Sequence, residues 1–249
     1  MATVPETPFA GPRYENRRHA GQELADAVSH LSGLNAIVLG IPRGGVPVAL
    51  EVAKSLDAGL DVVVARKLGH PDHPDYGLGA VAPGVRVLNQ SEIDATGISA
   101  SALAEVERRE LLEVERRTAN FRIGQAPPDF EKRVVIVVDD GVALGVTARA
   151  ALESVWAEHP SRVVFAAPVG TQLAQDYLGA FADEVIIPYK PKPFRAVGLH
   201  YKDFEQVTDD AVVEAIQSQP RVRRRPARRT RNAKAILRGE MPKTRPQGP

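Results

Sequence analysis

Short apolar runs recur along this 249-residue chain, and segments of helical periodicity separate them. The runs have the length of strands and lie at residues 35–40, 60–68, 134–138, 161–170 and 183–188. The segments with helical spacing lie at residues 13–33, 48–56, 99–121, 148–159 and 171–180. Strands that alternate with helices form a mostly parallel sheet, because each connection must cross back over one face of the sheet. The pattern therefore predicts an α/β fold, with an open, mostly parallel sheet and helices on both of its faces.

The length and the charge distribution divide the chain into one domain and two ends. A chain of 249 residues is long enough for one sizeable α/β domain, which we expect at residues 13–220. Residues 1–12 are rich in proline and are expected to be disordered. Residues 221–249 hold eleven Lys or Arg and one acid, Glu240. This tail therefore carries a charge of about +10, and the rest of the chain about −9.

The basic tail has two interpretations, and it is too polar to fold by itself. Its bases could neutralise phosphates and make nonspecific contact with RNA or DNA, although it has no aromatic residue for stacking on bases. Alternatively, the tail stays solvated or docks on the acidic body of the chain.

Several kinds of protein and site are disfavoured by what the sequence lacks. It has no cysteine, which excludes disulfides and cysteine-based zinc sites. Its apolar runs are too short to span a membrane, and its first residues have neither the basic end nor the apolar segment of a signal peptide. We therefore expect a cytoplasmic protein with no membrane partner. His70 and His73 have no third ligand nearby in the sequence and are interpreted as exposed polar residues rather than metal ligands.

Unusual residues follow three of the predicted strands, in the stretches GIPRGG, ARKLGHPDHPDYG and DDGVALGVT. In open α/β sheets, ligands bind beyond the carboxyl ends of the strands. Glycine-rich turns that open a helix let backbone N–H groups approach an anion closely. Phosphate binding is therefore indicated at Gly44, Gly45, Gly141 and Gly145. Neither turn matches GxxxxGK(S/T) or GxGxxG, which argues against an ATP-type P-loop and against a dinucleotide site.

Two adjacent acids, Asp139 and Asp140, follow the strand at 134–138. Neighbouring carboxylates repel each other unless a positive or hydrogen-donating group lies beside both. Ribose hydroxyls and Mg²⁺ can do this, the metal through the ribose or through water. With a phosphate-binding turn on either side, the simplest ligand is a sugar with phosphates at both ends and its diol facing the acids. The alternative is that the two acids cap the following turn and helix.

Basic residues near the predicted strand ends fit a pyrophosphate group. Arg66 and Lys67 end the strand predicted at 60–68, and Arg43 lies in the PRGG turn. Arginine and lysine stabilise the negative charge of a departing pyrophosphate. Each of them, taken singly, could also be a solvated surface residue.

With these motifs, residues 13–215 resemble a type I phosphoribosyltransferase. The resemblance is greatest to a bacterial group that carries IPRGG, ARKLG and a late PFRAVGLHYKDFEQVTD segment. It implies a Rossmann-like fold with a small hood, a homodimer, and binding of 5-phosphoribosyl-1-pyrophosphate (PRPP) with Mg²⁺. The reaction implied is displacement of pyrophosphate from C1 of PRPP by a nitrogenous base, through an oxocarbenium-like transition state that is stabilised electrostatically.

The resemblance also assigns roles to residues. Asp139 and Asp140 would bind the ribose 2- and 3-hydroxyls, and the turn from Pro42 to Gly45, with a non-proline cis peptide bond, would bind the pyrophosphate. Arg66 and Lys67 would contact the same group, with the loop after them closing over the site, and these two bases and the two acids are the implied catalytic residues. The 5-phosphate would lie on the loop of Gly141, Val142, Ala143, Leu144, Gly145, Val146 and Thr147.

Two positions depart from the family pattern. The family loop reads acid-acid-x-x-x-Thr-Gly-x-Thr, and Leu144 replaces its first threonine. A leucine removes one hydroxyl donor to the 5-phosphate, which costs about 1–3 kcal/mol if the group is buried, whereas the backbone amides and Thr147 remain. Ala143 stands where some purine-using members carry an acid that acts as a base.

The segment after the last predicted strand lies where the family has its hood. Phe194 and Asp203 are interpreted there as base-binding residues, by stacking and by accepting from an amino group, and the alternative is a hydrophobic core turn. The alternative function for the whole chain is a protein that senses PRPP or a nucleotide without turnover and binds nucleic acid through its basic tail.

Overall fold

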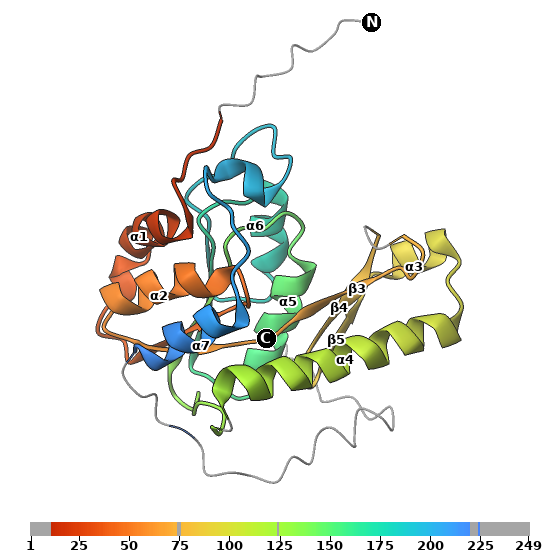
Figure 1. The fold of residues 1–249 in the computed structure, drawn as a ribbon, viewed down its shortest axis with the longest axis horizontal. Coiled ribbons are helices and arrows are strands. Elements are labelled where there is room, and N and C mark those ends of the chain that lie inside the picture. Colours follow the sequence, from red (N-terminus) through yellow and green to blue (C-terminus); the bar gives the residue numbers. More distant parts are fainter. Residues whose placement is uncertain (1–10, 74–75, 124, 220–223, 225–249) are drawn as a thin grey trace, which may run out of the picture.

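A computed structural model describes residues 11–73, 76–123, 125–219 and Arg224 (Figure 1). Its centre is a five-stranded parallel sheet with the strand order β2-β1-β6-β7-β8. These strands are β1 (Ala36–Gly40), β2 (Gly59–Val62), β6 (Val134–Val138), β7 (Arg162–Ala166) and β8 (Glu184–Ile186). The α/β class and the mostly parallel sheet that the sequence predicts are confirmed.

The two central strands, β1 and β6, are buried along their whole length. Val38 and Ile136 face one hydrophobic core, and Ile37 and Val135 face the core on the other side of the sheet. A strand that is buried on both faces needs an apolar residue at every position. This is why β1 and β6 read as continuous apolar runs and not as alternating ones.

Helices cover both faces of the sheet (Figure 1). One face carries α1 (Arg17–Ala27), α2 (Gly45–Ser55) and α7 (Asp209–Gln217), and the other carries α5 (Val146–Trp156) and α6 (Gln172–Leu178). Val52 of α2 belongs to the same core as Val38, and Leu152 of α5 belongs to the same core as Ile37. Two short 3-10 helices are η1 (Ser29–Leu31) and η2 (Val197–His200).

A second, antiparallel sheet projects from the side of the first (Figure 1). It consists of β3 (Arg66–Gly69), β4 (Gly77–Ala82) and β5 (Val85–Leu88), and two helices follow it, α3 (Gln90–Thr96) and α4 (Ala100–Arg122). α4 packs along β3 and β4, and α5 packs on β4 and β5, which joins the second sheet to the main one. Within the described ranges, no helix combines the length and the apolar character needed to cross a membrane.

The prediction of one strand at residues 60–68 is wrong. These residues belong to two strands, β2 and β3, which lie in two different sheets. Pairing with β1 ends at Val62, opposite Gly40, and residues 63–65 are buried in a connection before β3 begins. These residues are apolar on either side of the break, so periodicity cannot show where one strand stops. Arg66 and Lys67 therefore begin a strand of the second sheet and do not end a strand of the first.

The sequence pattern does not predict β4, α3 or α7. β4 begins at the end of the stretch ARKLGHPDHPDYG, whose last part is interpreted as a loop. Its glycines interrupt the alternation of apolar and polar residues that marks a strand. Gly79 is required by space, since a Cβ there would lie 2.1 Å from the Val87 carbonyl oxygen of β5. For α7 a signal was present: Thr208 caps the helix, and two acids, Asp209 and Asp210, occupy its first turn.

A buried ion cluster joins β2, the end of α4 and the start of the C-terminal tail. Asp61 is fully buried, and its two carboxylate oxygens accept from Arg122 Nε and Arg224 Nη1, each at 2.9 Å. Arg122 also donates to the Val62 carbonyl, and Arg224 to the Ala126 carbonyl. Arg224 thus docks on the acidic body, as one interpretation of the tail expects. The other residues predicted to form the tail, and residues 1–10 of the predicted disordered end, lie outside the described residues.

Arg122→Met tests the ion cluster. We expect it to lower the free energy of unfolding by about 3 kcal/mol, because it leaves a buried carboxylate with one of its two cations. Urea denaturation followed by circular dichroism measures the change. Arg108→Met is the matched control, since it breaks an exposed pair with Glu105 on the same helix and should leave the midpoint nearly unchanged. An Arg122→Met protein as stable as this control would contradict the role given to the cluster.

Candidate functional site

The PRGG turn and the acid pair meet at the carboxyl ends of neighbouring strands. β1 and β6 pair in parallel, and just beyond β1 the Ile41 N–H donates to the Val138 carbonyl at 2.8 Å. From β1 the chain continues outward to β2, and from β6 it continues in the other direction to β7 and β8. The order therefore reverses between β1 and β6, and such a switch point is where open α/β sheets bind ligands.

Two glycines allow the close contact between these loops. A Cβ on Gly44 would lie 2.0 Å from Asp140 Oδ2, and one on Gly45 would lie 2.6 Å from the Val138 carbonyl oxygen. Gly44 has a helical backbone, with φ −61° and ψ −36°, so any residue could adopt its conformation. Glycine is therefore required at position 44 only because the Asp140 carboxylate leaves no room for a side chain.

The PRGG turn has the cis peptide bond that the resemblance implies, between Pro42 and Arg43. The Arg43 guanidinium lies 3.5 Å from the carboxylate of Asp209, at the start of α7, and both side chains are partly exposed. Arg43 thus places a positive charge at the edge of the turn.

The two acids use their carboxylates differently. Asp139 Oδ1 accepts from the backbone N–H of Asp140 at 2.8 Å. Asp140 Oδ2 accepts from Arg17 Nε at 2.8 Å, in an ion pair whose side chains are only 12% and 14% exposed. These two hydrogen bonds use one oxygen of each carboxylate, and the two carboxyl groups also lie close enough to interact with each other. Neither acid caps α5, whose N-cap is Gly145, so the helix-capping alternative is wrong.

Burial raises the pKa of both carboxyl groups. For Asp139 burial is the largest cause, and the negative charge of Asp140 adds to it. For Asp140 burial also raises the pKa, whereas the charge and the hydrogen bond of Arg17 act in the opposite direction. The pair is therefore stabilised by a ligand that brings positive charge or hydrogen-bond donors.

The loop after the acids leads into a helix that no side chain of the described residues caps. Gly145 is the N-cap of α5, with a φ of +84° that favours glycine. The helices α1, α4, α6 and α7 are instead capped by the side chains of Asn16, Ser99, Thr171 and Thr208. The N–H groups in the first turn of α5 point out of its N-terminal end and have no partner within the helix. Together with the helix dipole they can bind an anion.

The side chains of this loop differ in exposure. Val142 is buried and bridges to Gly170, whereas Ala143 is exposed and Leu144 is 64% exposed. Thr147 lies partly buried in the first turn of α5. Because Leu144 faces solvent, packing in the core does not explain why a leucine stands there.

Residues 194–205, which we call the hood segment, cover the acid loop. The Tyr201 hydroxyl donates to the backbone carbonyl of Asp140 at 2.5 Å. The Phe204 ring lies over the Arg17 guanidinium, with 3.8 Å between the ring centroid and Cζ. The segment in which the resemblance placed the hood thus lies beside the acid pair.

The two predicted base-binding residues have structural contacts in the hood segment. Phe194 is half-buried, and its ring centroid lies 5.3 Å from that of His200. Asp203 is exposed, and its Oδ1 accepts from the Glu205 N–H at 3.0 Å. Phe194 therefore packs in a small core, as the core-turn alternative expects, and Asp203 stabilises a turn. These contacts leave a role in base binding untested.

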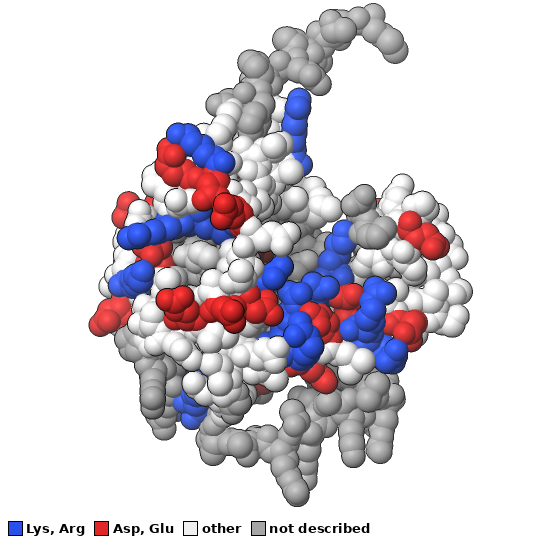
Figure 2. Space-filling view, in the orientation of Figure 1, with Lys and Arg blue, Asp and Glu red and all other residues white. Residues whose placement is uncertain are grey.

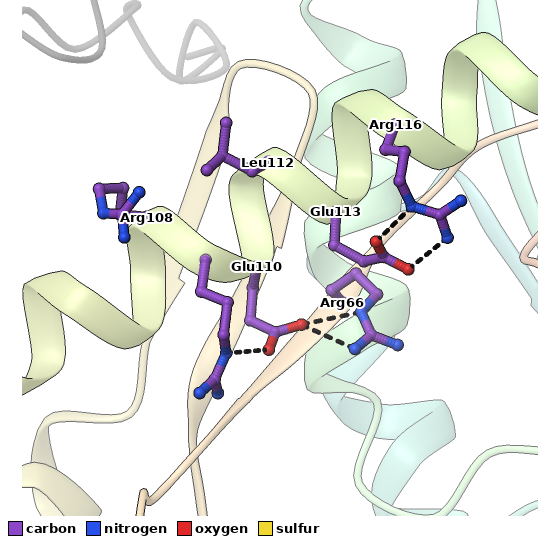
Figure 3. A pocket seen from close by; sticks show the side chains of 7 residues that line it. Arg66, Arg108, Glu110, Leu112, Glu113 and Arg116 are labelled. Carbon is purple, nitrogen blue, oxygen red and sulfur yellow. Dashed lines mark hydrogen bonds and ion pairs between the residues drawn. The ribbon is translucent and has the colours of Figure 1, made fainter.

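Arg66 lies against α4, beside Glu110 (Figure 3). Its Nε donates to Glu110 Oε2 at 2.9 Å, and Glu110 also pairs with Arg109. A pocket of about 430 Å³ beside them is lined by Arg66, Arg108, Arg109, Glu110, Leu112, Glu113 and Arg116. Lys67 is exposed and lies opposite Ala80 of β4. Figure 2 shows basic and acidic side chains side by side over this region.

Arg17, Tyr201 and Phe204 are site residues that the sequence alone does not identify. Arg17 is the first residue of α1 and lies beside Arg18, which is exposed. Both positions have the same local pattern, so no local signal distinguishes them. The contact that distinguishes Arg17 joins residues 123 positions apart.

The residues of the site fit a magnesium ion that is held mainly by its ligand. Within the described part of the chain, no group of three or more His, Cys, Asp or Glu side chains is placed to hold a metal. Asp139 and Asp140 each have one oxygen outside the hydrogen bonds with the Asp140 N–H and with Arg17. Mg²⁺ usually binds one or two carboxylates and completes its shell with water and substrate phosphates, which is what this site could provide.

Gly44→Ala tests the close contact between the PRGG turn and Asp140. The new methyl group must displace the Asp140 carboxylate and disturb its pair with Arg17, so we expect a loss of about 1–3 kcal/mol in the free energy of unfolding. Urea denaturation measures it. Gly179→Ala is the matched control, because its added carbon meets its nearest neighbours at ordinary distances of 3.4 and 3.5 Å. Equal stability of the two variants would show that the contact tolerates a side chain.

Comparison with known proteins agrees with this geometry. A family model for the phosphoribosyl transferase domain matches residues 14–177. A protein found in two strains of Mycobacterium tuberculosis, H37Rv and CDC 1551, and provisionally named a phosphoribosyl transferase, is 45% identical over 201 residues. The match covers 80% of this chain and 45% of that protein, so the matched segment spans less than half the length of this relative.

A solved structure has the same fold. The protein TT1426 from Thermus thermophilus is 41% identical, and its crystal structure matches with a TM-score of 0.69 over 83% of this chain and 98% of its own. The family model includes both the PRGG turn and the acid loop. The chain therefore belongs to the phosphoribosyltransferase family.

Proposed function

We propose that this protein transfers the phosphoribosyl group of PRPP to a nitrogenous base and releases pyrophosphate. The observation that carries the proposal is the meeting of the PRGG turn and the acid pair at the switch point of the sheet, beside the N-terminus of α5, which no side chain of the described residues caps. Together these features offer acceptors for a diol and N–H donors for two phosphorylated ends.

Each part of PRPP has a matching part of the site. The ribose 2- and 3-hydroxyls face the carboxylates of Asp139 and Asp140, on the oxygens outside the hydrogen bonds with the Asp140 N–H and with Arg17. The 5-phosphate lies against residues 141–147 and the first N–H groups of α5. The pyrophosphate lies at the PRGG turn, where Arg43 adds positive charge.

The reaction exchanges one bond at C1 of the ribose for another. The bond from C1 to the pyrophosphate oxygen breaks, and the oxygen keeps the electron pair. A base nitrogen forms the new bond to C1 and loses its proton. Positive charge develops on the ribose ring, close to Asp139 and Asp140, while Arg43 stabilises the charge of the leaving group. When bound, Mg²⁺ supplies further neutralisation of the pyrophosphate. Ala143 has no titratable side chain, so the proton goes to another acceptor.

Arg66 and Lys67 are proposed to assist the pyrophosphate from the second sheet. Glu110 is almost fully buried and holds the Arg66 guanidinium in one orientation. The Arg66 side chain is still 34% exposed, so part of the guanidinium can reach a ligand. To contact pyrophosphate, Arg66 must share or leave its ion pair with Glu110.

The acceptor is proposed only as a class, a nitrogen heterocycle bound under the hood segment. This segment lies on the acid loop through the Tyr201 hydrogen bond, next to the proposed ribose position. Phe194 offers a ring for stacking and Asp203 a carboxylate for an amino group.

One observation favours a second function, the exposed Leu144 in the phosphate loop. Because leucine has no donor for the 5-phosphate, PRPP could bind too weakly or too loosely for turnover. The protein would then sense PRPP or a nucleotide, and its basic tail would contact nucleic acid. Saturable nucleotide binding without pyrophosphate release from PRPP, over a screen of bases, would favour this function.

Calorimetric titration of PRPP with Mg²⁺ into the full chain tests the proposed function. We expect saturable binding, and we expect Asp140→Asn to weaken it by about 10–100-fold, because a ribose hydroxyl loses a charged acceptor. Asp176→Asn, at an exposed position of α6, is the control and should bind normally. Near-native affinity of Asp140→Asn would refute the diol contact, and failure of the native chain to bind PRPP would refute the function.

Leu144→Thr tests the placement of the 5-phosphate. The new hydroxyl should donate to the phosphate and tighten PRPP binding by about tenfold, measured in the same titration. Leu34→Thr replaces another exposed leucine, at the opposite end of β1, and should leave the affinity unchanged. If Leu144→Thr also binds like the native chain, the 5-phosphate does not lie on this loop.

A further inference from the structure

A buried acid of α4 holds one edge of the Arg66 guanidinium. Arg66 Nε donates to Glu110 Oε2 at 2.9 Å, and Arg66 Nη2 lies 2.8 Å from the same oxygen (Figure 3). The Glu110 side chain is 10% exposed and the Arg66 side chain 34%. An arginine side chain has many rotamers in solution, and a charge-assisted contact with a fixed carboxylate selects among them. Glu110 thus orders Arg66 before any ligand arrives.

The packing of β3 directs Arg66 toward α4. Leu68 belongs to the same hydrophobic core as Val106 of α4, whereas Ala65 belongs to the core on the other side of the main sheet. Successive side chains of a strand point to opposite faces, so Arg66 lies on the same face as Leu68. The contact with Glu110 therefore follows from how the strand and the helix pack.

Arg66 leaves the main sheet close to the PRGG turn. The Val63 N–H donates at 3.1 Å to the carbonyl of Gly40, which is the last residue of β1 and comes just before this turn. Arg66 follows Val63 by only three residues, which span at most about 11 Å. Ala65 also belongs to the same core as Ile41, the residue between β1 and the turn. Arg66 is therefore attached to the edge of the sheet at which the pyrophosphate is proposed to lie.

The guanidinium can hold Glu110 and a second anion together. An arginine presents its N–H donors as a rigid planar fork with more than one edge. The contact with Glu110 uses the edge formed by Nε and Nη2, and Nη1 lies outside this pair. Arg66 can therefore donate to an anion from its Nη1 edge without leaving Glu110.

The charge of Glu110 does not cancel the attraction for an anion. Glu110 Oε1 also accepts from Arg109 Nε at 3.2 Å, so two arginines share one carboxylate. Four arginines and two glutamates line the pocket beside Arg66, which leaves an excess of two positive charges there. An acid can thus orient Arg66 while its surroundings stay positive.

We propose that Glu110 is a positioning residue for the transfer reaction, which keeps the Nε edge of Arg66 and turns its Nη1 edge toward the pyrophosphate. Arg66 then shares its ion pair with the ligand and does not break it. This role rests on the proposed function, because it presupposes a pyrophosphate at the PRGG turn. A guanidinium that is already ordered binds more tightly, since less rotational freedom is lost on binding.

A comparison of Glu110→Gln with Glu110→Met tests the positioning. Both variants remove the negative charge and keep a long side chain, but only glutamine keeps an oxygen that accepts from Arg66. We expect Glu110→Met to bind PRPP with Mg²⁺ about 2–10-fold more weakly than Glu110→Gln, because a rotamer-rich side chain must then be ordered on binding. Calorimetric titration of the full chain measures both affinities. Ribose 5-phosphate has no pyrophosphate and should bind equally to the two variants, whereas a general disturbance of the fold would weaken both ligands.

A double-mutant cycle shows whether Glu110 acts through Arg66. In an Arg66→Met background the difference between the glutamine and methionine variants should disappear, because the residue that Glu110 orients is gone. Glu105→Gln and Glu105→Met are the matched controls, since Glu105 forms an exposed pair with Arg108 on the same helix. These two variants should bind PRPP alike.

The ordering of Arg66 can also be observed without a ligand. Nitrogen-15 NMR follows the Nε–H of Arg66, with Arg66→Lys used to assign the signal. A hydrogen bond to a buried carboxylate protects this proton, so we expect slow exchange with water in the native chain. The signal should be retained in Glu110→Gln and lost through fast exchange in Glu110→Met. A signal that is equally protected in both variants would contradict ordering by Glu110.

The outcomes separate this inference from the proposed function. Equal PRPP affinities of the two Glu110 variants, in a chain that binds PRPP, overturn the positioning role and leave the function intact. A difference that persists in the Arg66→Met background also overturns it, because Glu110 would then act by another route. If the native chain does not bind PRPP, the function and the role of Glu110 are both refuted. Should Glu110→Met not fold, Glu110→Leu replaces it in the comparison, and the same difference is expected.

Discussion

Two carboxylates stand side by side at the end of the central strand β6, and the Arg17 guanidinium lies against one of them. Because both side chains are partly buried, the repulsion between them is strong, and a positive or hydrogen-donating partner stabilises their charged form. The rest of the site is arranged around this contact. Gly44 leaves the space that the Asp140 carboxylate occupies, and the hood segment closes over Arg17 with Phe204 and the Glu205 carbonyl.

The order of the strands explains why these loops can meet. Because the sheet runs outward in both directions from β1 and β6, the connections that leave these two strands lead away from each other, and open α/β sheets bind ligands at such a point. The two loops at this point open α2 and α5, each with glycine at its N-cap. In the proposed function, the charged ends of a phosphorylated sugar would match backbone donors, while its hydroxyls would match carboxylates.

The same principle of pairing buried charge appears away from the site. Asp61 is neutralised by two arginines, one of which is the described residue of the basic tail. Arg66 of β3 is held by Glu110 of α4, so a residue expected to face pyrophosphate is also part of the packing of the second sheet. Ion pairs thus tie the second sheet and the start of the tail to the body of the chain.

The sequence by itself determined the fold class, the central strands and the two loops of the site, because apolar runs, glycine turns and adjacent acids are local signals. It could not show that residues 60–68 belong to two sheets. The residues between β2 and β3 are apolar and buried, so they have the same sequence pattern as the inside of one continuous strand. Nor could it single out Arg17 from Arg18. Only the tertiary structure decided these points, because they depend on contacts between segments far apart in the chain, such as the pair between Arg17 and Asp140.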